Sequence, residues 1–127
     1  MKILVTDGID KAAKDQLESY GHAVIEHSYA PEQLGTALRQ FDAVIIRSAT
    51  QIDQTIIDAC QGSRLKWILR AGVGLDNIAV SYAKDHGIGV FNTPQASAES
   101  VAELAMAHIF SCARYISICG QQMRQDR

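Results

Sequence analysis

The sequence predicts an α/β fold with an open five-stranded parallel sheet, helices on both faces of the sheet and one long helix at the end. Three observations lead to this prediction. Short apolar runs alternate with segments of helical spacing along the 127 residues. The runs are continuous rather than alternating in polarity, which is typical of parallel strands buried on both faces. No hairpin turn signal separates them, which disfavours the alternative, a two-layer α+β arrangement.

The first two strand–helix units occupy the first third of the chain. Lys2–Thr6 is apolar and β-branched, and Asp10–Tyr20 has apolar residues at helical spacing up to Gly21. His22–His27 is the second predicted strand. Pro31–Phe41 is the second predicted helix, because proline is tolerated in a first helical turn.

Three further strands and two helices complete the sheet. Asp42–Ile46 is followed by the helix Asp53–Cys60, whose first residue is a typical helix cap. Leu65–Leu69 is followed by the helix Asp76–His86, again with its aspartate as the expected cap, and Ile88–Phe91 is the fifth strand. Right-handed crossovers place the helices on both sides of the sheet, so these units predict a flavodoxin-like domain over residues 1–98.

Residues 99–127 are predicted to form one long helix, over Ser100–Met123. Ser100 and Glu103 have the spacing of a capping box. Apolar residues between 100 and 119 cover almost every face, which is typical of a helix buried on all sides. Charged residues interrupt the run, so a membrane span is not expected. We expect the 100–119 helix to contact a missing domain or a second copy of the chain; the alternative is a helix packed on the sheet.

Composition disfavours several classes of protein. The net charge is −2 and no basic stripe is present, so nucleic acid is not an expected partner. Cys60, Cys112 and Cys119 lack the spacing of a disulfide framework or of a metal site, which favours a cytoplasmic protein. The first apolar run is too short for a secretory signal.

The stretch ILRAGVGLDNI has part of the glycine pattern of a dinucleotide-binding turn. Asn77 stands where the third glycine is needed, and Asn92 stands where a carboxylate would hold a ribose. We therefore reject it as the main dinucleotide site. Glycines let backbone N–H groups form an anion-binding nest, here at Gly72, Val73 and Gly74. The alternative is a tight turn that binds nothing.

Polar residues follow several strands at the edge where α/β proteins bind ligands. Arg47 and Ser48 follow the third strand, Arg70 and the 72–74 turn follow the fourth, and Asn92 follows the fifth. Carboxyl ends of parallel strands share one edge of a sheet. Two arginines, a backbone nest and an amide there predict a site for a small anion.

Catalytic groups are not evident. Hydride or proton transfer requires an acid or base beside the substrate. The four histidines lie at strand or helix ends or inside the last helix: His22, His27, His86 and His108. No nucleophile motif or metal cluster is visible, so we assign no catalytic and no metal-binding residue. The chain alone is expected to bind an anion and not to convert it.

Four motifs in order resemble the D-isomer-specific 2-hydroxyacid dehydrogenases. They are RSAT from residue 47, LKWILRAGVGLDNI from 65, HGIGVFNTP from 86 and SVAELAMAHI from 100. RSAT and RAGVGLDN are most similar to the 3-phosphoglycerate dehydrogenase subgroup. The resemblance implies a flavodoxin-like substrate domain and a long helix leading into an NAD-binding Rossmann domain. The homo-oligomer that we expect rests on the apolar 100–119 helix.

The resemblance also implies roles for individual residues. The backbone of Val73 and Gly74 corresponds to the contact with the substrate carboxylate, and Val73 to a position against the nicotinamide. Arg47 corresponds to a rim residue that would meet a 3-phosphate, and Asn92 to the asparagine at the cleft. Arg70 would hold the rim together. Ser97 departs from the family, many of whose members carry asparagine there.

The implied function is that of part of an oxidoreductase. The parent enzyme would transfer a hydride from a D-2-hydroxy acid, 3-phosphoglycerate, to NAD, and this chain would bind the anionic substrate. The glycine fingerprint and the catalytic arginine, glutamate and histidine of the family are not in this sequence. The open alternative is a non-catalytic small-anion-binding or dimerisation module of flavodoxin-like fold. A receiver domain is disfavoured, because Arg47 stands where it needs an acid.

Overall fold

The computed structural model describes residues 1–125, in which five strands and six helices form. The strands are β1 (Lys2–Val5), β2 (Ala23–Glu26), β3 (Ala43–Ile46), β4 (Trp67–Arg70) and β5 (Gly89–Asn92). The helices are α1 (Lys11–Ser19), α2 (Pro31–Leu38), α3 (Gln54–Ala59), α4 (Val80–Asp85), α5 (Ala98–Ala113) and α6 (Ile116–Gln125). The chain divides into two compact units, Met1–Pro94 and Gln95–Arg127.

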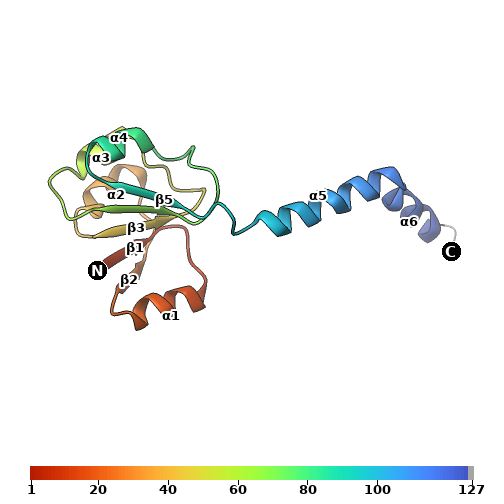
Figure 1. Cartoon of the computed structure of the whole chain (residues 1–127), viewed down its shortest axis with the longest axis horizontal. Coiled ribbons are helices and arrows are strands. Elements are labelled where there is room, and N and C mark those ends of the chain that lie inside the picture. The colour runs from red at the N-terminus through yellow and green to blue at the C-terminus, as the bar shows by residue number, and fades with distance from the viewer. Residues whose placement is uncertain (126–127) are drawn as a thin grey trace. The chain divides into compact units, whose positions relative to one another are not determined.

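The first unit is an open sheet in which all neighbouring strands are parallel. The strand order is β2-β1-β3-β4-β5. This is the flavodoxin-like order, in which the direction of winding changes between β1 and β3. The predicted fold class is confirmed. Figure 1 shows α2, α3 and α4 on one side of the sheet and α1 on the other.

The core lies between the sheet and the three helices α2, α3 and α4. The strands present Leu4, Val44, Ile46 and Ile68 to this side, and all four are fully buried. Burying one such side chain stabilises the fold by roughly 1.5–3 kcal/mol. Asp53 caps α3 as predicted, since its Oδ1 accepts a hydrogen bond of 3.0 Å from the Ile56 N–H.

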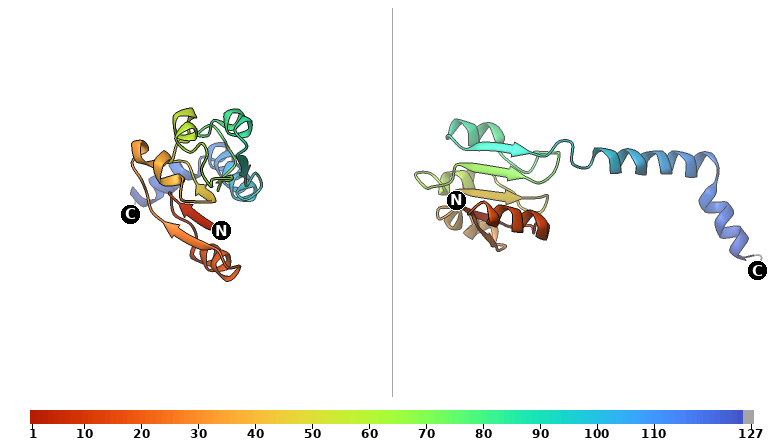
Figure 2. Two further views of the ribbon diagram at one scale, coloured as in Figure 1. Left: turned by 90° about the vertical axis from the view of Figure 1, so that its left-hand side faces the viewer. Right: turned by 60° about the horizontal axis from the view of Figure 1, so that its bottom comes forward.

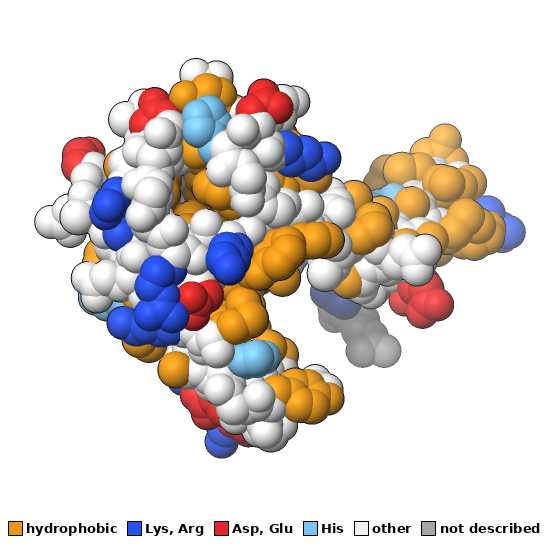
Figure 3. Space-filling view, turned by 60° about the vertical axis from the view of Figure 1, so that its left-hand side comes forward, with side chains coloured by type: hydrophobic (Ala, Val, Ile, Leu, Met, Phe, Trp, Pro, Cys, Tyr) orange, Lys and Arg blue, Asp and Glu red, His pale blue; other side chains and the backbone are white. Residues whose placement is uncertain are grey.

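The opposite face of the sheet is covered only in part, which corrects the expectation that all strands are buried on both faces. Two large side chains on this face, Trp67 and Phe91, are exposed by 39% and 54%, and their ring centroids lie 5.6 Å apart. Ile45, Leu69 and the α1 residue Leu17 line a hollow of about 320 Å³ together with these rings. Hydrophobic side chains gather in the hollow between the sheet and α1 in Figure 3.

Gly89 allows the Trp67 ring to lie flat against β5. A Cβ at residue 89 would stand 2.5 Å from two atoms of the indole. The two residues are direct partners in the register of β4 and β5. The apolar surface of Ile45, Trp67, Leu69 and Phe91 is called the open sheet face below.

The second unit contains two helices where the sequence predicted one. Helix α5 begins at Ala98, Ser97 makes no side-chain capping bond, and the predicted capping box at Ser100 is wrong. The helix breaks at Tyr115, whose φ of 52° is a left-handed value that costs energy for a residue with a Cβ. Helix α6 follows at a bend of 60°. Figure 2 shows this bend.

Helices α5 and α6 present their apolar side chains without burying any of them. The exposed residues include Val101, Leu104, Ile109, Phe110, Ile116 and Ile118. Within residues 1–125 no single helix is long and apolar enough to cross a membrane; only the bent pair α5 and α6, taken together, meets the criteria of length and composition.

Candidate anion-binding site

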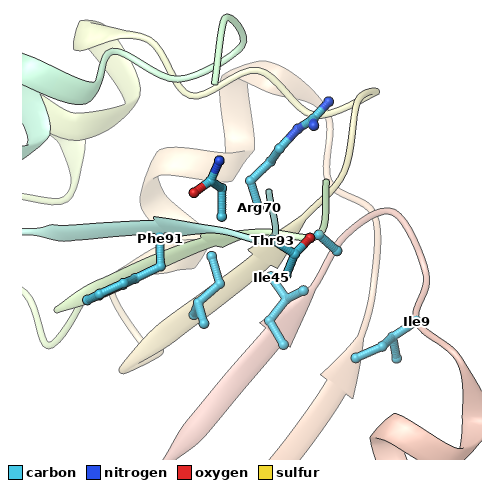
Figure 4. Close-up of a pocket in the computed structure, with 8 residues that line it drawn as sticks. Ile9, Ile45, Arg70, Phe91 and Thr93 are labelled. Carbon is cyan, nitrogen blue, oxygen red and sulfur yellow. The ribbon is translucent and has the colours of Figure 1, made fainter. Parts of the chain in front are cut away.

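The candidate site lies at the carboxyl ends of β3, β4 and β5, where the loops after these strands meet. The parallel register aligns Ile46 with Arg70 and Arg70 with Asn92. The side chains of Arg70 and Asn92 therefore leave the same side of the sheet. Figure 4 shows Arg70 on one side of the strands, with Ile45 and Phe91 on the other.

The loop after β4 is held in place by hydrogen bonds to β5 and its extension. Thr93 N donates to Gly72 O at 3.0 Å, and Asn92 Nδ2 donates to Val73 O at 2.7 Å. Gly72 N donates back to Arg70 O at 2.9 Å, so this N–H is not free for a ligand, contrary to the prediction. The N–H groups of Val73 and Gly74 make no hydrogen bond among the described residues and remain available to an anion.

Side chains packed against the loop explain both of its glycines. A Cβ on Gly72 would overlap the Arg70 guanidinium, and a Cβ on Gly74 would stand 2.7 Å from Asp76 Oδ1. Asp76 therefore lies against the loop and does not cap a helix. The predicted cap is wrong, because α4 begins only at Val80 and its N-cap residue is Ala79.

Arg70 is a cation without an anionic partner in the part of the chain that the structure describes. The salt bridges among residues 1–125 are Lys14–Glu26 and Arg64–Asp42, so neither Arg47 nor Arg70 takes part in one. Arg70 Nη2 lies 3.4 Å from Ser48 Oγ. Its Nε is buried and has no hydrogen-bond partner in the described chain. An apolar hollow of about 210 Å³ opens at this edge on the other side of the sheet, where Ile9, Ile45, Leu69 and Phe91 line it, and Arg70, Asn92 and Thr93 only border it.

The loop after β3, residues 47–50, is fixed by the carboxylate of Asp7. Asp7 Oδ2 accepts from Arg47 N at 2.7 Å and from Thr50 N at 3.1 Å, and Thr50 Oγ1 lies 2.6 Å from Asp7 Oδ1. Burial opposes ionisation of this carboxyl, but these hydrogen bonds outweigh burial and lower the pKa of Asp7 below its ordinary value.

Asn77 joins the loop after β3 to the loop after β4. Its Nδ2 donates to Arg47 O at 2.8 Å and to Thr50 O at 2.7 Å. Asn77 is 5% exposed, so these bonds are shielded from water. The backbone adds two bonds nearby, Ile52 N to Asn77 O and Ala79 N to Ile52 O, both 2.9 Å long.

The structure brings most of the predicted site residues into two contact groups. Ser48 meets Arg70, and Asn92 meets Val73. The Arg47 guanidinium is exposed and makes no hydrogen bond among the described residues, so only its backbone is fixed. Asp7, Thr50 and Asn77 were missed as loop-holding residues. The signal for Asn77 was a polar residue at the vacant glycine position, read only as a departure from a motif.

The three histidines of the first unit are engaged elsewhere, and the His27 ring packs edge-on against the Tyr29 ring with centroids 4.4 Å apart. His86 Nδ1 lies 2.8 Å from Tyr82 O, and His22 Nδ1 lies 3.4 Å from the N-terminal amine. No group of three or more His, Cys, Asp or Glu residues that could hold a metal ion occurs in the described part of the chain.

The 72–74 loop does not fit a dinucleotide. A ribose diol needs a carboxylate acceptor at the end of the next strand. Asn92 occupies that place, and its amide is already donating to Val73 O. The loop is followed by an irregular segment rather than a helix, since α4 starts at Val80, so no helix N-terminus faces a pyrophosphate. A small carboxylate or phosphate is the better match.

Comparison with known proteins gives a consistent result. The family model described as "D-isomer specific 2-hydroxyacid dehydrogenase, catalytic domain" matches residues 3–125. A hydroxypyruvate reductase of Thermotoga maritima is 43% identical over 99% of this chain and 41% of its own length. A D-3-phosphoglycerate dehydrogenase of Methanocaldococcus jannaschii is 40% identical over 91% of this chain and 22% of its own length.

A solved structure agrees in fold. The NAD⁺-bound 3-phosphoglycerate dehydrogenase of Entamoeba histolytica superposes with a TM-score of 0.71 at 34% identity, over 87% of this chain and 38% of that chain. This chain thus spans less than half the length of each of these three proteins.

Proposed function

This chain belongs to the D-isomer specific 2-hydroxyacid dehydrogenase family, and we propose that it forms the substrate-binding part of an NAD-dependent D-2-hydroxyacid dehydrogenase. One observation carries the proposal: the N–H groups of Val73 and Gly74, which bind no described residue, lie on the loop against which Arg70 packs, and Arg70 has no anionic partner in the described chain. Backbone donors and a guanidinium together match the oxygens of a carboxylate.

The substrate we propose is 3-phosphoglycerate. Its two anionic groups need two positive contacts, and the edge of the sheet offers Arg47 and Arg70, neither of which forms an ion pair in the described chain. The carboxylate would be held at Val73 and Gly74, and the phosphate by Arg47, whose planar guanidinium suits bidentate contact. Ser48 and Asn92 would keep Arg70 and the loop in place.

Hydroxypyruvate, or the D-glycerate formed from it, is the second candidate substrate. The relative from Thermotoga maritima is a hydroxypyruvate reductase and is 43% identical to this chain. A substrate with a single anionic group would need the 72–74 loop and Arg70 but not Arg47. The two candidates therefore differ in whether Arg47 contributes to affinity.

The cofactor of the proposed reaction would be held mainly by residues that this chain does not contain. Bound NAD would accept the C2 hydride of the hydroxy acid, and a base would accept the hydroxyl proton. The described residues supply neither a dinucleotide site nor a placed base. Val73 is half exposed and apolar, and we propose it as the one contact with the nicotinamide end.

Binding measurements on the 127-residue chain test the proposal. Titration of ¹⁵N-labelled chain with 3-phosphoglycerate should shift the amide signals of Val73 and Gly74. Arg47→Ala should weaken binding about ten-fold, the loss of one charge-assisted contact, while Arg124→Ala on α6 leaves it unchanged. If Arg47→Ala weakened 3-phosphoglycerate binding no more than D-glycerate binding, the second substrate would be favoured.

An activity assay tests the division of labour. We expect no NADH formation from the chain with 3-phosphoglycerate and NAD. Turnover above background that tracks the purified chain would contradict the proposal that the redox machinery lies elsewhere.

We further propose that α5 and α6 dock against a missing domain or a second copy of the chain. Their exposed apolar residues support this proposal. We also propose that the protein works in the cytosol, which the three free cysteines support.

A further inference from the structure

We propose that Asp7, Thr50 and Asn77 are positioning residues of a preformed anion site: Asp7 and Thr50 fix loop 47–50 at the end of β1, and Asn77 joins this loop to loop 72–78. These three are called the bracing residues. The inference rests on the proposed anion-binding function of the site. It assigns roles to residues that contact no substrate in that proposal.

The first step of the argument is electrostatic. A carboxylate near the rim of an anion site repels the ligand, so Asp7 on its own would weaken binding. Its oxygens are instead occupied by the Arg47 N–H, the Thr50 N–H and the Thr50 hydroxyl, at 2.6–3.1 Å. Charge-assisted bonds of this kind are stronger than neutral ones. The main effect of the carboxylate is therefore to hold the backbone of loop 47–50 in place, rather than to repel the ligand.

The second step concerns the other side of the same loop. Asn77 donates to the carbonyls of Arg47 and Thr50, the two residues whose N–H groups bind Asp7. The loop is thus held at both of its ends from two directions. A loop bonded in this way has little freedom left, so the direction in which Arg47 leaves the backbone is set before any ligand arrives.

The third step connects the two halves of the site. Asn77 lies five residues after Gly72 on the loop that follows β4, and the parallel bridge between Ile52 and Ile78 extends the connection. Ser48, inside the braced loop, contacts Arg70 at 3.4 Å. The bracing residues therefore fix the backbone of Arg47 relative to the loop that carries Val73 and Gly74. Preorganisation of this kind reduces the entropy cost of binding.

Two substitutions of Asp7 separate bracing from simple charge. Removing a negative charge near an anion site should tighten binding if charge alone matters. We expect the opposite for Asp7→Ala: about ten-fold weaker binding of 3-phosphoglycerate and of inorganic phosphate, the loss of one charge-assisted bond. Asp7→Asn keeps an oxygen for the Arg47 and Thr50 N–H groups and should bind at least as tightly as the unaltered chain.

Amide hydrogen exchange gives a readout that needs no ligand. Asp7→Ala should raise the exchange rates of the Arg47 and Thr50 amides about ten-fold, while the core strand residue Ile68 is unchanged. Thr50→Val, which removes only the hydroxyl, should act in the same direction. Thr50→Ser should restore both readouts. Thr55→Val on the exposed face of α3 is the matched control.

The outcomes are distinguishable. If the unaltered chain binds neither anion, the proposed function fails, and the exchange rates still decide whether the bracing residues hold the loops. Exchange rates in Asp7→Ala and Thr50→Val equal to those in Thr55→Val would overturn the inference. Faster exchange with unchanged affinity would overturn it too, since the loops would then be held without any effect on the site.

Discussion

The guanidinium of Arg70 lies against the backbone of Gly72, so closely that a Cβ at residue 72 would overlap it. The first prediction follows from this contact. Gly72→Ala should displace Arg70 and weaken anion binding about ten-fold, the loss of one charge-assisted contact. Isothermal titration with 3-phosphoglycerate measures the effect. Gly120→Ala, where a Cβ meets nothing within 4 Å, is the control and should leave affinity unchanged.

The second prediction concerns acid stability. The pKa of Asp7 is lowered in the folded chain from its ordinary 3.8, because hydrogen bonds from Thr50 and Arg47 outweigh the effect of burial. The stability from this carboxylate is therefore fully present above pH about 4 and is lost as the pH falls through the lower, folded value. Urea unfolding between pH 6 and pH 2.5 should show this loss. Asp7→Asn should make the free energy of unfolding depend less steeply on pH. An equal pH dependence of the unfolding free energy in both proteins would contradict this prediction.

The third prediction concerns thiol reactivity. Burial raises the pKa of the Cys60 thiol to about 11, and the Arg39 charge opposes this only in part. Its Sγ also lies 3.3 Å from Gly35 O. The thiolate is the reactive form, so at pH 8 Cys60 should resist iodoacetamide while the exposed Cys112 and Cys119 react. Mass spectrometry should find two labels on the native chain and a third only after unfolding.

The fourth prediction tests the apolar surface of α5 and α6. Large exposed apolar patches on soluble proteins mark interaction surfaces. We expect the isolated chain to self-associate and Ile116→Glu to shift it toward monomer in size-exclusion chromatography with light scattering. Gln121→Glu adds the same charge to the same helix without removing an apolar side chain, and it should behave like the unaltered chain. Monomers throughout would mean that this surface does not join copies of the chain.

The fold could be predicted because local pattern and topology agree. Continuous apolar runs such as Lys2–Val5 and Ala43–Ile46 lie in the central strands, where the sheet order needs them. How far helices cover each face of the sheet could not be predicted. The run around Trp67 is as apolar as the others, yet within the first unit the only described helix on that face is α1, which packs beside β2 at the far edge. An apolar run shows which strand residues could be buried, but it does not show whether a helix packs over them.

The details of the site depended on long-range contacts that spacing alone cannot reveal. Asp76 has the sequence position of a helix cap, but the chain continues irregularly to Val80 because Ile78 pairs with Ile52. Asn77 has the position of a missing glycine. Its role comes from the hydrogen bonds it donates to the carbonyl groups of Arg47 and Thr50, which lie 30 and 27 residues earlier in the chain. The helix break at Tyr115 could not be predicted either, because no glycine or proline stands at this position.

Trp67 is the chain's single tryptophan, and it lies at the centre of the open sheet face with more than a third of its surface in water. Indole emission moves to shorter wavelength when the ring leaves water, and iodide quenches it only where the ion can reach. A partner that bound to this face would therefore shift the emission of Trp67 to shorter wavelength and reduce its quenching by iodide. Binding to the open sheet face can thus be followed by fluorescence without an attached label.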